Sequence, residues 1–470
     1  MLSRACAGDR RKLMDCGPKN AMAAVNTAEG AEPRRNDGAP GWHRPAAGIL
    51  GSWLIVLTAM FTCSTAIAQT GDSSATAGEA TKPDAATTVK AEQTDVATLH
   101  IVLARELRDL QLPVSLLDLP PDNDGIPGAQ LAVDDNNTTG KFMKQAFKLD
   151  VVENKDPQAL VAAVVDKVDS GEPFIVADMA ADTLLKLSDA LANKDAIIFN
   201  ASAPDQRLRE ADCRANVKHT APSRAMLADA LGQYMAVKRW TNWLLVAGSE
   251  PGDKLYAEEL KRTAKKFRMN IVGEMEFKYE VGSRRADGGY EQIQQQIPSF
   301  LQNAPAHDVV VVIDEGRLFG DYFPYRTWQP RPVIGTVGLF ATSWHPAIEL
   351  WGGTQFQNRF KRLAKRNMRA LDYNVWMAVR SIGEAATRKR SIDPQVLIDY
   401  MRTPEFEIAA FKGRKLTYRQ WNGQLRQPIL LATDNLHVTV SPQKEFLHQF
   451  SELDTLGTDR TESACKAYQN

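Results

Sequence analysis

The sequence has few cysteines and no excess of charge of either sign. Five cysteines occur among 470 residues. Lysine plus arginine and aspartate plus glutamate each number 57, so the chain has no global attraction for nucleic acid or for anionic lipid. We therefore expect no nucleic-acid partner. The apolar content of 44% and the length are those of a globular protein with two or three domains.

Sequence motifs of catalysis and metal binding are also missing. The chain contains no G-x-S-x-G, no P-loop, no H-E-x-x-H and no G-x-G-x-x-G after a strand. Its histidines lie far apart in sequence, and none has a second ligand at the spacing of a metal site. The segment DNDG, Asp122 to Gly125, lacks the alternating ligands of a calcium loop. We therefore predict no catalytic residues, no metal, no cofactor and no enzymatic activity.

The N-terminal region has the layout of a secretory signal peptide. Arginines up to Arg44 precede a stretch from Pro45 to Gly71 without any charge, and Ala66-Ile67-Ala68 is a small-x-small cleavage site. We expect residues 1–68 to be removed and residues 69–96 to form a flexible linker. The alternative is a retained membrane anchor, because the apolar stretch is long enough to span a bilayer.

Only two cysteines, Cys213 and Cys465, lie beyond the expected cleavage site. Export to an oxidising compartment allows them to form a disulfide, which would tie the C-terminal tail to the body of the protein. The alternative is two unpaired thiols.

The remaining chain alternates between strand-like and helix-like segments, which predicts parallel sheets covered by helices. The pattern occurs twice, before and after about residue 220, and indicates two α/β lobes. The expected strands are 99–104, 147–152, 173–177, 196–200, 243–248, 270–277 and 308–314, and the expected helices include 157–168, 182–193, 222–240 and 253–267.

Several local phrases resemble the type I periplasmic solute-binding proteins of the branched-chain amino acid receptor group. GAQLAVDDNN, Gly128 to Asn137, followed by Gly140, is similar to the first helix of that family. NASAPD, Asn200 to Asp205, resembles the loop after its fourth strand, and HTAPSRAMLADALGQYM resembles its crossover into the second lobe. DYNVWMAVRSIGEA, Asp372 to Ala385, is similar to the late helix that returns to the first lobe.

This resemblance implies a two-lobed type I periplasmic-binding-protein fold with a hinge and a ligand cleft between the lobes. The implied function is that of a periplasmic component that binds a small solute by cleft closure and delivers it to a membrane ABC permease. The alternative is a ligand-sensing or accessory receptor that is not coupled to transport. The implied segments are 97–220 and 346–403 for lobe 1, 221–345 for lobe 2, and 404–470 for the completion of lobe 2 and the tail.

Four further phrases look like a subgroup of such receptors that is associated with pyrroloquinoline-quinone (PQQ)-dependent alcohol dehydrogenase systems. They are DNNTTG, CRANVKHTAPSRAMLADAL, WNGQLRQPILLA and VSPQKEFLHQ. A link to periplasmic alcohol oxidation is therefore a further expectation.

The polar run Asp134 to Thr139 follows the small apolar residues of the first helix. We expect this run to end a short helix and to turn the chain toward the next strand, with Asp122 to Pro127 facing the cleft.

The resemblance also places candidate ligand contacts. Asp178 follows the third strand, where amino-acid receptors of the family carry a serine and threonine cluster, and Ser202 matches a hydroxyl position after the fourth strand. Glu315 falls where the second lobe usually supplies an acid. Each acid has an alternative role as a solvated loop residue. Because most hydroxyls of the family site are missing, a less anionic or differently shaped solute is expected.

Overall fold

The structure is a computed structural model that describes residues 96–109, 113, 119–278 and 289–468. The expected signal peptide, and all of the expected linker except its last residue, lie outside these residues. Within the described part, none of the helices combines the length and the apolarity that a membrane crossing requires.

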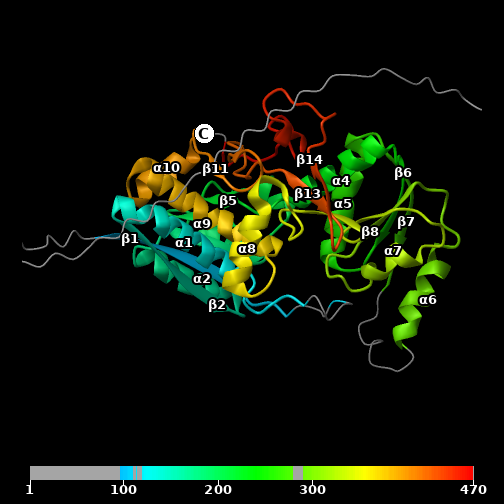
Figure 1. The fold of residues 1–470 in the computed structure, drawn as a ribbon, viewed down its shortest axis with the longest axis horizontal. Helices are drawn as coiled ribbons and strands as arrows, with labels where there is room; N and C mark the ends of the chain where they lie inside the picture. Colours follow the sequence, from blue (N-terminus) through cyan, green and yellow to red (C-terminus); the bar gives the residue numbers. More distant parts are fainter. Residues whose placement is uncertain (1–95, 110–112, 114–118, 279–288, 469–470) are drawn as a thin grey trace, which may run out of the picture. The chain divides into compact units, whose positions relative to one another are not determined.

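The first lobe is built on a parallel sheet of five strands (Figure 1). Each strand after the first is reached through a helix or a longer connection, as parallel pairing requires. The strand order is β2-β1-β3-β4-β5. The strands are β1 (Ala97–Glu106), β2 (Gln145–Asn154), β3 (Phe174–Asp178), β4 (Ile197–Asn200) and β5 (Val217–His219).

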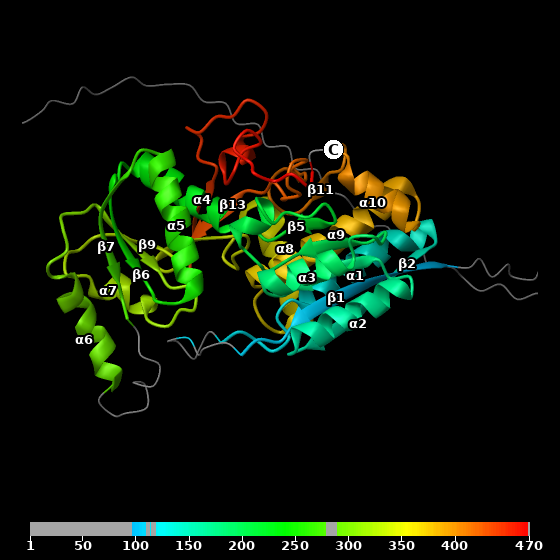
Figure 2. The same cartoon turned by 180° about the vertical axis from the view of Figure 1, so that it is seen from behind.

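Helices cover both faces of this sheet (Figure 2). Alternate residues of β3 serve opposite faces: Val176 packs in the core under α1 (Ile126–Met143) and α9 (Ala370–Lys389). Its neighbour Ile175 packs under two other helices. Those helices are α2 (Pro157–Asp169) and α3 (Ala181–Ala190), while α8 (Gly353–Ala364) and α10 (Pro394–Arg402) add to the first core.

The second lobe has a seven-stranded sheet in the order β14-β13-β10-β9-β8-β6-β7. Its strands are β6 (Asn242–Ala247), β7 (Asn270–Glu276), β8 (Val309–Ile313), β9 (Val333–Gly335), β10 (Leu339–Thr342), β13 (Ile429–Ala432) and β14 (His437–Ser441). Its helices are α4 (Arg224–Lys238), α5 (Pro251–Lys266), α6 (Gly289–Leu301) and α7 (Phe323–Arg326).

The prediction of two α/β lobes is confirmed, with one refinement in the second sheet. Five of its strands run parallel, but β13 pairs antiparallel with β10 and with β14. A connection of only 433–436 joins β13 to β14, and so short a connection can join only antiparallel strands.

Three connections carry the chain between the two sheets: from β5 to α4, from β10 to α8, and from β12 (Lys415–Leu416) to β13. Side-chain amides tie the first of these connections to the third. Gln424 donates from Nε2 to the carbonyl of Ala221 at 3.1 Å, and Gln427 donates to the carbonyl of Thr220 at 2.8 Å. The pair β11 (Ile408–Ala409) and β12 packs in the core of the first lobe.

The prediction that the run from Asp134 to Thr139 ends a short helix is wrong. The run lies inside α1, which continues to Met143. Buried Asn136 donates from Nδ2 to the carbonyl of Val379 in α9 at 3.0 Å. Asn137 exchanges two hydrogen bonds with the backbone of Phe147 in β2. These polar side chains are compatible with a helix interior because neighbouring elements satisfy them, which a local pattern does not reveal.

Candidate functional site

The carboxyl ends of β1 and β3 bring charged side chains together in the first lobe. Asp178, the last residue of β3, is only 6% exposed. Its carboxylate lies 3.7 Å from Nε of Arg105 and 3.4 Å from Nη2 of Arg108. Burial raises the pKa of Asp178, while both arginines and a hydrogen bond from Ser202 oppose the rise. The arrangement is a buried carboxylate with one buried and one half-exposed guanidinium beside it.

Ser202 lies beside Asp178, on the loop that follows β4. Its Oγ accepts from the N–H of Met179 at 3.1 Å and donates to the carbonyl of Met179 at 3.3 Å. Asn200 shapes this loop, because its Oδ1 accepts from the N–H of Ala203 at 2.9 Å. The structure therefore brings together the two first-lobe residues that the sequence singled out.

Glu315 lies on the loop after β8 in the second lobe and forms a two-pronged ion pair. Nε and Nη2 of Arg224 each donate to a Glu315 oxygen at 2.8 Å. Nη1 of Arg224 lies 3.2 Å from Oδ2 of Asp205, which belongs to the loop after β4 in the first lobe. Gly252 allows close approach, since a Cβ there would lie 2.5 Å from Oε2 of Glu315. Glu315 is thus oriented by an arginine that also contacts the other lobe.

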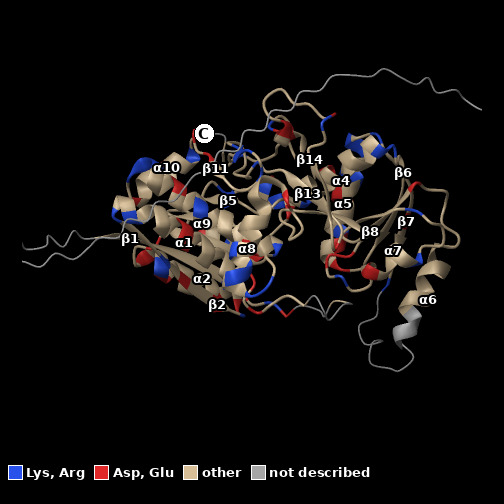
Figure 3. Cartoon of the chain, in the orientation of Figure 1, with Lys and Arg blue, Asp and Glu red and all other residues tan. Residues whose placement is uncertain are grey.

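Basic and acidic residues are interspersed along the described chain (Figure 3). Three residues that could together bind a metal ion lie close to one another: the possible ligand atoms of His100, Asp150 and Glu172 are within 4.8 Å of each other. Lys167 lies between two of them, 3.4 Å from Asp150 and 3.2 Å from Glu172. Its ammonium already supplies the positive charge that these carboxylates attract.

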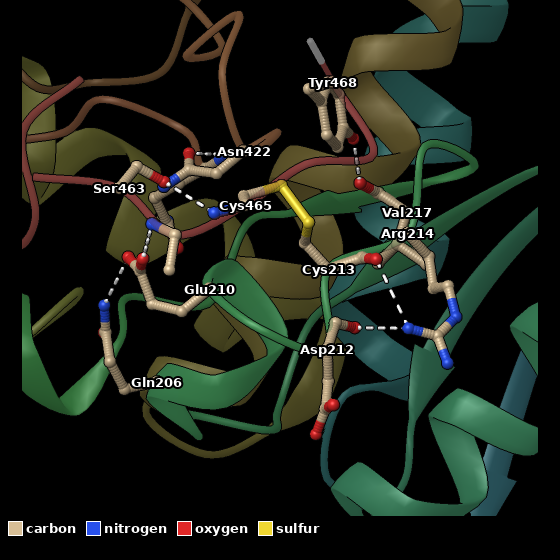
Figure 4. Close-up of a disulfide and its surroundings, with 12 residues drawn as sticks. Gln206, Glu210, Asp212, Cys213, Arg214, Val217, Asn422, Ser463, Cys465 and Tyr468 are labelled. Carbon is tan, nitrogen blue, oxygen red and sulfur yellow. Dashed lines mark hydrogen bonds between the residues drawn. A yellow bond between two sulfur atoms is a disulfide. The ribbon is translucent and has the colours of Figure 1, made fainter. Parts of the chain in front are cut away.

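The two cysteines of the described chain are joined by a disulfide in the structure (Figure 4). Cys213 follows η2 (Gln206–Arg209) in the first lobe, and Cys465 lies near the end of the C-terminal tail, 252 residues further on. Both residues are buried.

Comparison with known protein families shows which family the chain belongs to. The model of the periplasmic binding protein family matches residues 122–435, which is more than half of the chain. The chain belongs to the periplasmic binding protein family. No curated protein matched the chain in a sequence search.

Solved structures of similar fold are binding proteins at low sequence identity. A periplasmic binding protein from Burkholderia mallei superposes with a TM-score of 0.56 at 13% identity, covering 79% of this chain and 98% of its own. A leucine-, isoleucine-, valine-, threonine- and alanine-binding protein from Brucella ovis gives 0.57 at 14%, covering 73% and 95%. A solute-binding protein of an ABC transporter from R. palustris, in complex with benzoate, gives 0.55 at 12%, covering 79% and 99%.

The sequence reading of this binding protein missed three arginines of the candidate site. Arg105 and Arg108 come directly after the apolar run of β1, so their place at a strand end was a usable signal. Arg224 begins α4 and carried no such signal, because its partner Glu315 is 91 residues away. The candidate site is therefore more cationic than the residues chosen from the sequence imply.

Asp253, in the first turn of α5, supports the loop that carries Glu315. Its Oδ1 accepts from the N–H of Glu315 at 2.8 Å, while its buried Oδ2 has no hydrogen-bond partner in the described structure. Burial raises the pKa of Asp253 from 3.8 to about 7, and the charges of Asp314 and Glu315 act in the same direction.

We expect Asp253→Asn to stabilise the binding protein at high pH. When the pKa of an acid is higher in the folded than in the unfolded protein, the fold becomes less stable as the pH rises from the unfolded pKa to the folded pKa. For Asp253 this loss is complete above about pH 7. The rise of the pKa from 3.8 to about 7 corresponds to ~4 kcal/mol in full, at ~1.4 kcal/mol per tenfold change in proton affinity. We expect the variant to recover ~1–2 kcal/mol of this at pH 8. At pH 4 the gain should vanish. Urea unfolding at both pH values measures it, and an equal gain at both would contradict the assignment.

Proposed function

We propose that the chain is the periplasmic solute-binding component of an ABC transporter. The observation that carries the proposal is the family match over residues 122–435. Charged side chains lie at the carboxyl end of β3 in the first sheet and after β8 in the second. Ligands of open α/β sheets bind beyond the carboxyl ends of the strands. A type I receptor closes its lobes about a hinge when the solute contacts both. Its implied partners are a small solute and a membrane permease.

The proposed contacts are Asp178 and Ser202 from the first lobe and Glu315 from the second. Arg108 is added because its guanidinium is half exposed beside Asp178 and can pair with an anionic group of the solute. The buried Arg105 lies 3.7 Å from the Asp178 carboxylate and helps to hold it in place. No bond-making chemistry is proposed, so these groups act by charge pairing and hydrogen bonding.

We expect Glu315→Gln to weaken solute binding about tenfold or more. A hydrogen bond to a charged group contributes ~1.5–3 kcal/mol, and the exchange removes the charge while keeping the size of the side chain. The solute is first found by a thermal-shift screen of amino acids, aromatic carboxylates and alcohols, and affinity is then measured by calorimetry. Glu274→Gln, at an exposed site within β7, is the matched control. Unchanged affinity in Glu315→Gln would exclude Glu315 as a contact.

The proposed location is the periplasm, after removal of residues 1–68. N-terminal sequencing of the exported protein should begin near Gln69; recovery only from membranes with Trp53 still present would contradict cleavage.

Two finer features are proposed from sequence phrases alone. One is a link to PQQ-dependent alcohol oxidation, which predicts that short alcohols or their acids appear among the hits of the screen. The other is the alternative role as a receptor without transport. Uptake of the identified solute in a deletion strain separates the two roles, because a transport component is required for uptake and a sensor is not.

A further inference from the structure

The C-terminal segment 452–468 first binds the second lobe. Leu456, which follows η5 (Glu452–Thr455), is fully buried in the core under α4 and α5. The next residue, Gly457, donates its N–H to buried Asp229 of α4 at 2.8 Å. Its carbonyl accepts from Nζ of Lys266 in α5 at 3.0 Å. The segment is therefore anchored on two helices of the second lobe.

The same segment then binds the first lobe. Oγ1 of Thr458 accepts from Nε2 of Gln206 at 2.8 Å. Further on, the N–H of Ala464 donates to Oε2 of Glu210 at 2.6 Å. Both partners belong to the loop between β4 and β5, whose Leu208 packs in the first-lobe core. Adjacent Cα atoms are about 3.8 Å apart, so a single peptide unit, from Gly457 to Thr458, carries the chain from one lobe to the other.

A covalent bond fixes the first-lobe end of this segment. Cys465 is bonded to Cys213, and the hydroxyl of Tyr468 donates to the carbonyl of Val217 in β5 (Figure 4). Figure 4 shows the hydroxyl of the Tyr468 ring pointing to the carbonyl of Val217, near the disulfide between Cys213 and Cys465. The hydrogen bonds to the first lobe can open and close, but the disulfide cannot without a reductant.

Tyr468 also covers a buried lysine. Lys218 of β5 is 1% exposed, and its Nζ has no hydrogen-bond partner in the described structure. The ammonium lies 5.6 Å from the ring centroid of Tyr418 and 5.0 Å from that of Tyr468. Burial lowers the pKa of Lys218 to about 7. Removal of the tail would take away one of the two rings and admit water to this amine.

We propose that segment 452–468 is a strap that restrains the hinge between the lobes, and that the Cys213–Cys465 disulfide locks the strap. While the disulfide is intact, the lobes cannot separate at this point unless Gly457 loses its hydrogen bonds to α4 and α5 or Thr458 loses its hydrogen bond to the first lobe. A dithiol reductant unlocks it: two electrons and two protons pass to the cystine, two thiols form, and the reductant becomes a disulfide. The inference rests on the proposed function in that the lobes bend about the hinge.

The first measurement is the distance between the lobes. Keto-bearing amino acids placed at exposed Lys141 in α1 and Lys265 in α5 accept aminooxy spin labels without using thiols. Pulsed electron paramagnetic resonance then gives the distance distribution. We expect a broader distribution in Cys213→Ser/Cys465→Ser than in the oxidised wild type. No solute is needed, so the result stands whether or not the proposed function does.

The second measurement is acylation of Lys218 by an N-hydroxysuccinimide acetate, followed by mass spectrometry. We expect roughly tenfold faster acylation in the double serine variant, because the tail opens locally. Lys412 is the internal control: it is equally buried, its pKa is also lowered to about 7 by burial, and it donates to the carbonyls of Ser343 and Pro428. It should stay protected in both proteins.

An unchanged distance distribution together with unchanged protection of Lys218 overturns the strap. If Lys412 also reacts quickly, the double variant has lost its fold. In that case both measurements are repeated on the wild type reduced with dithiothreitol under native conditions. A broader distance distribution and faster acylation of Lys218 support the strap, and no change in either overturns it.

Discussion

Asp454→Ala should lower the free energy of unfolding by ~3–5 kcal/mol, the cost of removing one partner from a buried ion pair. Asp454 is 2% exposed and accepts from Nε of Arg419 at 2.9 Å and from Nε of Arg426 at 2.9 Å. Arg419 is 1% exposed, and burial lowers its pKa against the effect of Asp454. Without the carboxylate, the Arg419 guanidinium remains buried with only carbonyl acceptors, those of Leu453, Leu456 and Thr458.

The control lies two residues away in the same short helix. Glu452 pairs with Arg414 at 2.9 Å, but both side chains are about half exposed. Surface pairs of this kind contribute ~0–1 kcal/mol, so Glu452→Ala should have little effect. Urea unfolding of the two variants measures the difference. Equal losses would show that burial of Asp454 does not determine its contribution, and Asp454→Asn, which keeps the shape, separates loss of charge from loss of packing.

Strands β1 to β4 and β6 to β8 could be predicted because most of their residues are apolar over short, bounded runs, whereas β5, β9, β10, β13 and β14 were not among the expected strands. The run Val309 to Ile313 is buried on both faces of the second sheet and is apolar at every position. Helix α2 shows the opposite pattern: only Leu160 and Val164, four residues apart, are fully buried. Patterns of this kind depend on neighbours in sequence, so a single sequence contains them.

The candidate site was predictable only where a strand end fixes the position. Asp178 ends β3 and Ser202 follows β4, and the carboxyl ends of these neighbouring parallel strands meet at one edge of the sheet. The role of Arg224 depends on the approach of Glu315, which only the folded chain provides. The prediction that the run Asp134 to Thr139 ends a helix was wrong for the same reason. Polar residues usually leave helix interiors, and the partners that keep Asn136 in α1 come from α9, more than 240 residues away.

The contact between α1 and α9 can be tested by a double-mutant cycle on Asn136 and Gly383. A Cβ added at Gly383 would lie 2.0 Å from Oδ1 of Asn136. Asn136 cannot swing away freely, because it donates to the carbonyl of Val379 and accepts from Arg380. We expect Gly383→Ala to destabilise the protein by ~1–3 kcal/mol through overpacking, and Asn136→Ala by ~1 kcal/mol through the lost hydrogen bond.

In the double variant this clash is absent, because the methyl group added at position 383 then meets the methyl group left at position 136 and no longer the longer amide side chain of Asn136. Alanine also favours a helix over glycine by ~1 kcal/mol, so Gly383→Ala in the Asn136→Ala background should be neutral or stabilising. The coupling free energy from urea unfolding of the four proteins should then be ~2 kcal/mol, within the range for residues in direct contact. Additive effects would mean that Asn136 is not packed against Gly383, and that the polar run of α1 does not determine how the two helices approach.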